Sequence, residues 1–327
     1  MESEQKLRSE LLALKRPRLD ISPKNIQDLR KEDEFYETSL LNGYTYKEQE
    51  VTKNGSISLL EILDNNDAVF IDTSILNYSL GGVEFNIINS LCDSRSLLEV
   101  SDELLHFSSK VNKTYEDIFR EHNAFIVQGQ IKEIEDKQRI ARSNFDYFNR
   151  RDINYADDRD KINEKVRVKK ELLSDYLFSL DNLIKAARRS VYFAEDNGCI
   201  ERATNVLRPF AVKHRLIKQE NWKKSLKDSD KKSDEIDFRI ATTALYAAQC
   251  GNKRIAVVTN DRDIVNVSAV ALAALESTNY LERDSYSLWS LGEGGDYRKR
   301  IGVDKSREGI FLDEGCMKVI KKIEGKK

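Results

Sequence analysis

The sequence predicts an α/β fold of three layers (α/β/α), in which a central parallel sheet lies between helices. Residues 68–71, 124–127 and 255–258 each form a run of four consecutive apolar side chains. A parallel strand that is covered on both faces needs such a continuous run rather than an alternating one. Segments with helical spacing of apolar residues connect the runs, and a helix is the common crossover between parallel strands.

The first part of the chain is polar, and the expected sheet begins after it. Residues 1–55 form an expected polar extension with a small basic cluster at Lys15, Arg16 and Arg18. The favoured interpretation of the cluster is a solvated tail with a helical start, and the alternative is a nuclear-import signal or a nucleic-acid contact. Residues 56–63 are expected to be a short helix before the first strand. Apolar spacing over 83–107 predicts one or two helices before the second strand, and a further helix begins after it.

A helical insertion is expected over residues 141–233. The apolar stripe of residues 172–184 predicts a long packed helix over 166–192. Residues 201–232 carry ten Lys and Arg against four Asp and Glu. These cations can bind backbone phosphates while aromatic side chains stack on bases, although a solvated amphipathic face has the same pattern. The expected RNA-binding residues are Lys213, Arg215, Trp222, Lys223, Lys224 and Lys227.

The rest of the chain returns to the sheet. A helix over 233–248, the strand 255–258, a helix over 264–275 and a last strand at 286–291 complete an expected domain that spans residues 56–300 with its insertion. Residues 301–327 are expected to be a basic C-terminal tail.

The composition excludes several classes of protein. The four cysteines are far apart and form no CxxC pair, which excludes a zinc site or a disulfide framework. No apolar run approaches the roughly 20 residues that cross a bilayer, and the first residues lack a signal-peptide core. We therefore expect a soluble, cytoplasmic protein, or a nuclear one if the basic cluster acts as an import signal. The net charge of −2 excludes neither nucleic-acid nor protein partners.

Carboxylates stand where the predicted strands end or the following helices begin. In open α/β sheets, ligands bind beyond the carboxyl ends of the strands. Two carboxylates in close contact repel by about 4 kcal/mol at surface-like dielectric, so a cation must hold such a cluster together. Without His or Cys at suitable spacing, oxygen ligands favour Mg²⁺ or Mn²⁺, and two such ions can activate water and stabilise the leaving oxygen of a phosphodiester. The candidate ligands are Asp72, Glu133, Asp237, Asp261 and Asp263.

Helix capping and other metal-binding folds are alternative interpretations of these acids. Asp72, Asp237 or Asp263, taken alone, could cap or begin a helix. A phosphatase of the haloacid-dehalogenase type needs an acid where Ser74 stands, and a DxSxS adhesion site needs a serine where Leu76 stands. Both of these metal folds are therefore excluded.

Four motifs resemble those of the PIN-domain nucleases, in the same order along the chain: FIDTSIL (70–76), IVQGQIKEIEDK (126–137), DFRIATTALYAA (237–248) and VVTNDRDI (257–264). The resemblance implies a divalent-metal-dependent ribonuclease in a PIN-like domain. It also implies that Asp72, Glu133, Asp237 and Asp261 are the acidic set, with Asp263 as a frequent fifth acid. Thr73, Ser74, Thr259 and Asn260 fall on positions that line the pocket in this family.

The chain departs from a minimal PIN domain in its N-terminal extension and in its long helical insertion. The second motif also offers two acids. Glu133 is favoured because it stands beside Ile131 and Ile134 on the face expected to pack on the sheet, whereas Glu135 is expected to face solvent.

The expected function is metal-dependent hydrolysis of single-stranded RNA. The alternatives are a PIN-like RNA-binding or scaffold protein with little catalysis, and a structure-specific DNA nuclease. The sequence leaves open the target, cleavage within the strand or from its end, the oligomeric state, and an inhibitory or recruiting protein partner.

Overall fold

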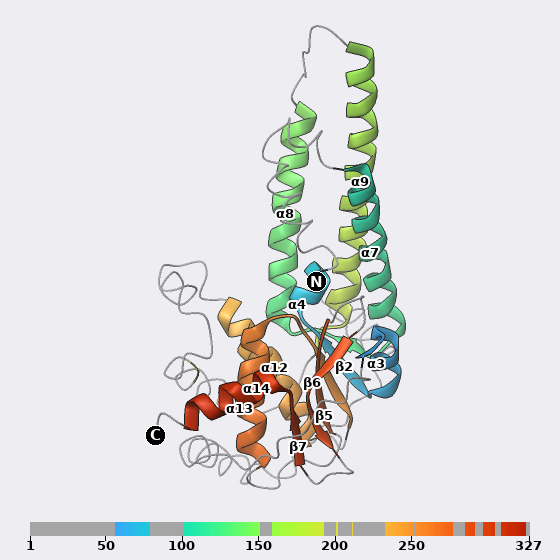
Figure 1. Cartoon of the computed structure of the whole chain (residues 1–327). Helices are drawn as coiled ribbons and strands as arrows, with labels where there is room; N and C mark the ends of the chain where they lie inside the picture. The colour runs from blue at the N-terminus through green and yellow to red at the C-terminus, as the bar shows by residue number, and fades with distance from the viewer. Residues whose placement is uncertain are drawn as a thin grey trace. The chain divides into compact units, whose positions relative to one another are not determined.

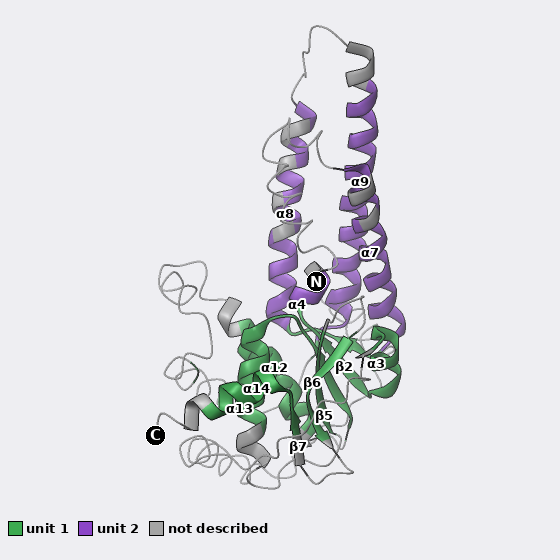
Figure 2. Ribbon diagram, in the orientation of Figure 1, with its two compact units in different colours: residues 1–72, 123–127, 192–327 green, residues 73–122, 128–191 purple. Residues whose placement is uncertain are grey.

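The structure, a computed structural model, describes residues 56–78, 101–150, 159–192, 201, 211, 233–250, 253–276, 285–291, 297–304 and 309–324. The chain forms two compact units, which are coloured separately in Figure 2. Unit 1 consists of Met1–Asp72, Asn123–Val127 and Tyr192–Lys327, and unit 2 consists of Thr73–His122 and Gln128–Val191. The expected N-terminal extension 1–55 lies outside the described residues, as does nearly all of 193–232.

Unit 1 contains a seven-stranded sheet, whose described strands follow the order β1-β6-β5-β4-β2-β3, with β7 paired to β6 (Figure 1). The strands are β1 (Ser56–Ile57), β2 (Ala68–Ile71), β3 (Ala124–Phe125), β4 (Ile255–Val258), β5 (Tyr286–Leu291), β6 (Tyr297–Asp304) and β7 (Gly309–Leu312). β3, β2, β4 and β5 are parallel to one another. β6 pairs antiparallel with β5, β1 and β7, so antiparallel strands extend the central parallel sheet that the sequence predicted.

Helices cover both faces of this sheet, and the fold is of the three-layer α/β/α type that the sequence predicted (Figure 1). α12 (Ser233–Cys250), α13 (Arg262–Glu276) and α14 (Glu314–Glu324) share one apolar core with Phe70, Val257 and Leu288. Side chains alternate along a strand, so Val69 and Ile71 face the other side, where α3 (Leu59–Asn65) packs on β2. The expected helix over 56–63 is therefore divided into strand β1 and helix α3, and a Ser58–Glu61 capping box begins the helix.

The C-terminal stretch is folded, and the prediction of a basic tail from residue 301 is wrong for the described residues up to 324. β7 joins the sheet, and Cys316, Met317 and Ile320 of α14 are buried. Burial raises the pKa of the Cys316 thiol well above its usual value. Lys318 and Lys321 are exposed on α14 while its apolar side chains are buried, so the charge of this stretch does not reveal its amphipathic helix.

Unit 2 is helical and consists of α4 (Thr73–Tyr78), α7 (Asp102–Glu121), α8 (Gln128–Arg150) and α9 (Arg159–Arg189). α7 and α9 are parallel, because Lys169 pairs with Asp102 and Asn112 donates to Ser179, and both pairs are 67 residues apart. α8 is antiparallel to α9: Glu135 pairs with Arg188, and the later Arg142 pairs with the earlier Asp181. The unit thus begins before the insertion predicted at 141–233, since α4 and α7 belong to it.

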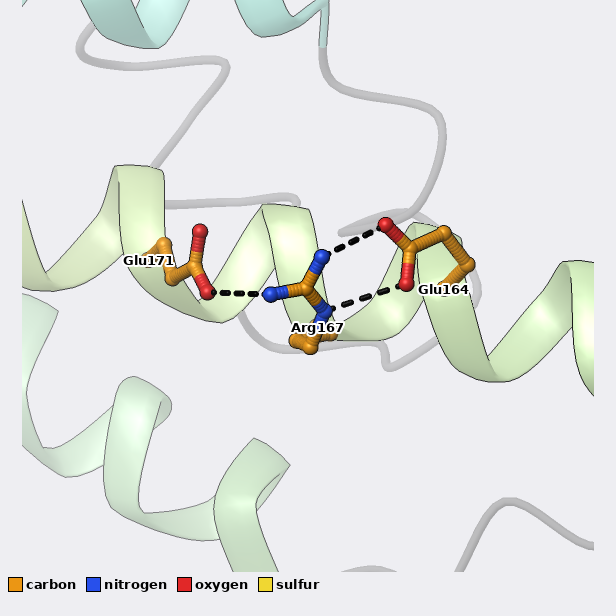
Figure 3. Close-up of polar contacts among 3 residues, drawn as sticks. All are labelled: Glu164, Arg167 and Glu171. Carbon is orange, nitrogen blue, oxygen red and sulfur yellow. Dashed lines mark hydrogen bonds and ion pairs between the residues drawn. The ribbon is translucent and has the colours of Figure 1, made fainter.

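The first turns of α9 extend past the start of α7, because Lys169 is already level with the first residue of α7. Arg167, in these turns, forms ion pairs within its own helix (Figure 3). The Arg167 guanidinium binds Glu164 at 2.7 Å and Glu171 at 3.1 Å. Such exposed pairs are screened by solvent and stabilise a helix only weakly. Within the part of the chain that the structure describes, no helix has the length and apolar character needed to cross a membrane.

Asp313 supplies a first testable prediction, because it both caps α14 and pairs with Arg300. Its Oδ1 accepts a hydrogen bond from the Cys316 amide at 2.9 Å, and its Oδ2 binds the Arg300 guanidinium. We expect Asp313→Ala to lower the free energy of unfolding by about 2 kcal/mol, as measured by chemical denaturation. Asp313→Asn should lower the free energy of unfolding by less, because Asn is also a good N-cap. Glu314→Ala, which removes an exposed pair with Lys318, serves as the control and should change little.

Candidate active site

The ends of β2 and β4 bring Asp72 and Thr259 together. Ile71 and Val258 are partners in this parallel pair, and the pairing continues one residue further. The Asp72 amide donates to the Val258 carbonyl at 2.9 Å, and the Thr259 amide donates to the Trp289 carbonyl at 3.0 Å. Backbone pairing therefore fixes both residues at the carboxyl edge, the edge of the sheet at which its parallel strands end.

A buried hydroxyl connects the two acids of this edge. Thr259 Oγ1 donates to Asp72 Oδ2 at 2.7 Å and accepts from the Asp261 amide at 2.9 Å. Asp72 is 4% exposed and Thr259 is 0% exposed. Because the amide can only donate, the hydroxyl proton points at Asp72, and Asp72 Oδ2 acts as an acceptor.

Asp261 has a second role, because it is the N-cap of α13. Its Oδ1 accepts from the Asp263 amide at 2.7 Å, and its carbonyl accepts from the Val265 amide at 3.2 Å. Among the described residues, Asp261 Oδ2 makes no hydrogen bond, so this oxygen can bind a cation while Oδ1 caps the helix. Asp263 and Asn260 are half-buried in the same turn.

Asp237 lies in the second turn of α12 and is half-buried. α12 packs on β4 and ends at Cys250, shortly before β4 begins. A helix that precedes a strand in this way runs opposite to it, so the first turns of α12 lie towards the carboxyl edge. The topology therefore places Asp237 at the same edge as Asp72 and Asp261.

Glu133 belongs to unit 2 and is half-buried in α8. Thr73 and Ser74 begin α4 of the same unit, and Gln130 of α8 donates to Thr73 Oγ1 at 3.2 Å. Glu135 was expected to face solvent, but it is half-buried and pairs with Arg188 at 2.6 Å. Glu135 thus has a cationic partner within unit 2.

The chemistry of these donors fits Mg²⁺ or Mn²⁺. Within the described ranges, no three His, Cys, Asp or Glu side chains are grouped closely enough to hold a metal ion. Mg²⁺, however, keeps several waters and is commonly bound through one or two carboxylates together with substrate phosphates. Asp72 and Asp261, linked through Thr259, are carboxylates of this kind.

The structure adds residues to this edge that the sequence did not single out, and it leaves others outside its described part. Ser290 and Arg298 lie on β5 and β6 in the same row of the sheet as Thr259. They could have been found only from the pairing of β6 with β5, which the sequence did not predict. The proposed RNA-binding residues Lys213, Arg215, Trp222, Lys223, Lys224 and Lys227 all fall outside the described residues, as do Lys15, Arg16 and Arg18.

Comparisons with protein-family models, with curated proteins and with solved structures found no match to this chain. A function for the carboxyl edge therefore has to be argued from its own residues.

Thr259 supplies a second prediction. We expect Thr259→Val to lower the free energy of unfolding by about 1–3 kcal/mol, because it removes partners of a buried carboxylate and of a backbone amide. Thr259→Ser keeps the hydroxyl and is the matched control. Chemical denaturation measures the free energy of unfolding of both variants. Equal values for Thr259→Val and Thr259→Ser would show that the hydroxyl contacts contribute little to stability.

Proposed function

We propose that the protein is a divalent-metal-dependent nuclease of the PIN-like type, which hydrolyses phosphodiester bonds in single-stranded RNA. The observation that carries this proposal is the hydrogen-bonded chain from Asp72 through Thr259 to Asp261 at the carboxyl edge. It puts a buried carboxylate and a half-buried one where ligands bind in open α/β sheets.

Asp72 and Asp261 of unit 1 would hold the metal together with waters and substrate phosphates, and Asp237, Asp263 and Glu133 are the further acids that the motifs assign to the set. Bound Mg²⁺ or Mn²⁺ would supply an activated water and would stabilise the leaving oxygen of the phosphodiester. The acid set contains only oxygen donors, which is the ligand type that these hard cations prefer.

The chain's own residues prepare the acids for this role. The Thr259 hydroxyl holds Asp72 in one orientation by donating to it. The start of α13 adds the partial positive charge of a helix N-terminus next to Asp261 and Asp263. The hydrogen bond orients one carboxylate, and the helix end attracts the negative charge of the other two.

RNA is the proposed substrate because the sequence combines an acidic site with a strongly cationic stretch at 201–232. An acidic site alone repels a polyanion, so cations elsewhere on the protein have to bind the backbone. Aromatic residues within the stretch can stack on unpaired bases, which favours a single strand.

The test of this proposal is a cleavage assay with the full chain. Labelled single-stranded RNA and DNA of one sequence are incubated with Mn²⁺ or with EDTA. We expect RNA cleavage only with the metal, and a loss of about 100-fold or more for Asp72→Asn and Asp261→Asn. Asn still caps a helix, so Asp261→Asn removes the charge without removing the cap. Asp175→Asn, at an exposed site on α9, is the matched control.

Cleavage that survives EDTA, or that both Asn variants retain, would contradict the metal mechanism. RNA binding without cleavage by the wild-type chain would favour the binding or scaffold alternative. Preferential cleavage of branched DNA would favour the DNA nuclease.

The two acids of the second motif give a further prediction. We expect Glu133→Gln to lower the cleavage rate at least about tenfold, whereas Glu135→Gln should stay close to wild type. Glu135 and Arg188 form a partly exposed pair, so its loss should cost little stability. The reverse order of the two rates would identify Glu135 as the catalytic acid.

A further inference from the structure

One row of residues crosses the sheet at the carboxyl edge. Ile71, Val258 and Trp289 are partners across β2, β4 and β5, so the residues that follow them, Asp72, Thr259 and Ser290, are also level. Ser290 is in turn the partner of Arg298 on β6. Three strand spacings separate Asp72 from Arg298 in this row, or about 14 Å.

All four side chains of the row belong to one face of the sheet. Phe70, Val257 and Leu288 point into the core beneath α12, α13 and α14. Each of Asp72, Thr259 and Ser290 stands two positions further along its strand and so belongs to the same face. Arg298 shares this face because directly paired residues point the same way.

A β-bulge determines which cation of β6 stands in this row. The register of β5 and β6 shifts between Leu288 and Trp289, so that Trp289 pairs with Lys299 and Ser290 with Arg298. Lys299 accordingly lies over the Trp289 ring, 5.9 Å from its centroid, on the opposite face. Bulges commonly re-aim side chains next to functional sites, and this one brings Arg298 to the face of the acids.

The charges around Arg298 are already paired with other partners. Arg300 binds Asp313, and Lys318 binds Glu314 at 2.5 Å. Lys318, and more weakly Arg298, hold the pKa of Glu314 below its usual value. Arg298 itself is exposed and forms no ion pair with any described residue, so it contributes excess positive charge at this edge.

Arg262 is a second exposed cation at this edge. It is the first residue of α13 and directly follows Asp261. A cation is unfavourable at the positive end of a helix, so Arg262 is poorly explained by helix stability. It also forms no ion pair with a residue that the structure describes. A phosphate beside the helix start would be attracted both by Arg262 and by the helix end.

We propose that Arg262 and Arg298 bind backbone phosphates of a single strand that passes the acids of the carboxyl edge. This inference rests on the proposed nuclease function and identifies how the site receives its polyanionic substrate. Guanidinium groups bind phosphate oxygens through two parallel hydrogen bonds, which gives a fixed geometry as well as charge. Contacts of this kind position the strand without selecting its sequence.

Binding in the absence of cleavage tests the inference. A labelled single-stranded RNA of about 16 nucleotides, and DNA of the same sequence, are titrated with the full chain in EDTA. Affinity is measured by fluorescence anisotropy between about 50 and 200 mM salt. We expect Arg262→Gln and Arg298→Gln each to reduce the slope of log affinity against log salt by about 0.7, and the double variant by about 1.4. RNA and DNA should respond alike, because the contacts are to phosphates.

Arg254→Gln is the matched control. Arg254 is an exposed arginine of the same unit, but it stands before β4, at the opposite edge of the sheet. Its replacement should leave the slope unchanged. An equal slope reduction for Arg254→Gln would mean that general charge, rather than this edge, is responsible.

A modified strand gives a second measurement. A methylphosphonate that neutralises a single phosphate should weaken binding to the wild-type chain, and at one position it should have no further effect on Arg298→Gln. Unchanged slopes and additive effects at every position would overturn the inference, and so would a wild-type chain that binds no RNA. If the slopes are unchanged but the chain cleaves RNA with metal, the nuclease proposal is supported and the phosphate contacts are not. If the slopes fall but the chain never cleaves RNA, the phosphate contacts are supported and the nuclease proposal is not.

Discussion

The buried hydroxyl of Thr259 is the contact on which the carboxyl edge depends. It accepts a hydrogen bond from the amide of Asp261 and donates one to Asp72, so its direction is fixed by one donor and one acceptor. The same residue is tied through its amide to Trp289 on the neighbouring strand. One residue thus connects the ends of three strands, through its hydroxyl and its amide, and contacts the turn from which α13 begins.

The parallel part of the sheet could be predicted because the signal for each strand, a continuous apolar run, lies within the strand itself. β2 and β4 have the predicted bounds, since strands buried on both faces have to be continuously apolar. β6 and α14 were missed for the opposite reason. Each exposes charged residues on one face, and the apolar residues of the other face are recognisable only when a packing partner is known.

The residues of the candidate site could be predicted from the sequence, but the hydrogen bonds that join them could not. The sequence indicates that Asp72 and Asp261 follow strands of one sheet, and the structure joins them through Thr259. The cap that Asp261 forms depends on backbone direction, which a sequence pattern does not specify. The position of Arg298 depends on a bulge in a strand pair that is antiparallel, so periodicity alone could not relate it to Asp72.

The contact between Asp72 and Thr259 also has a consequence for biosynthesis. The two residues are 187 positions apart, and closing so long a loop costs entropy before any contact compensates for it. β2, β3 and the helices of unit 2 leave the ribosome before β4 exists. A nascent chain that has not yet reached residue 259 contains Asp72 but lacks the Thr259 hydroxyl that orients it. The carboxyl edge can therefore assemble only after β4 has been synthesised, which delays the proposed activity until that point.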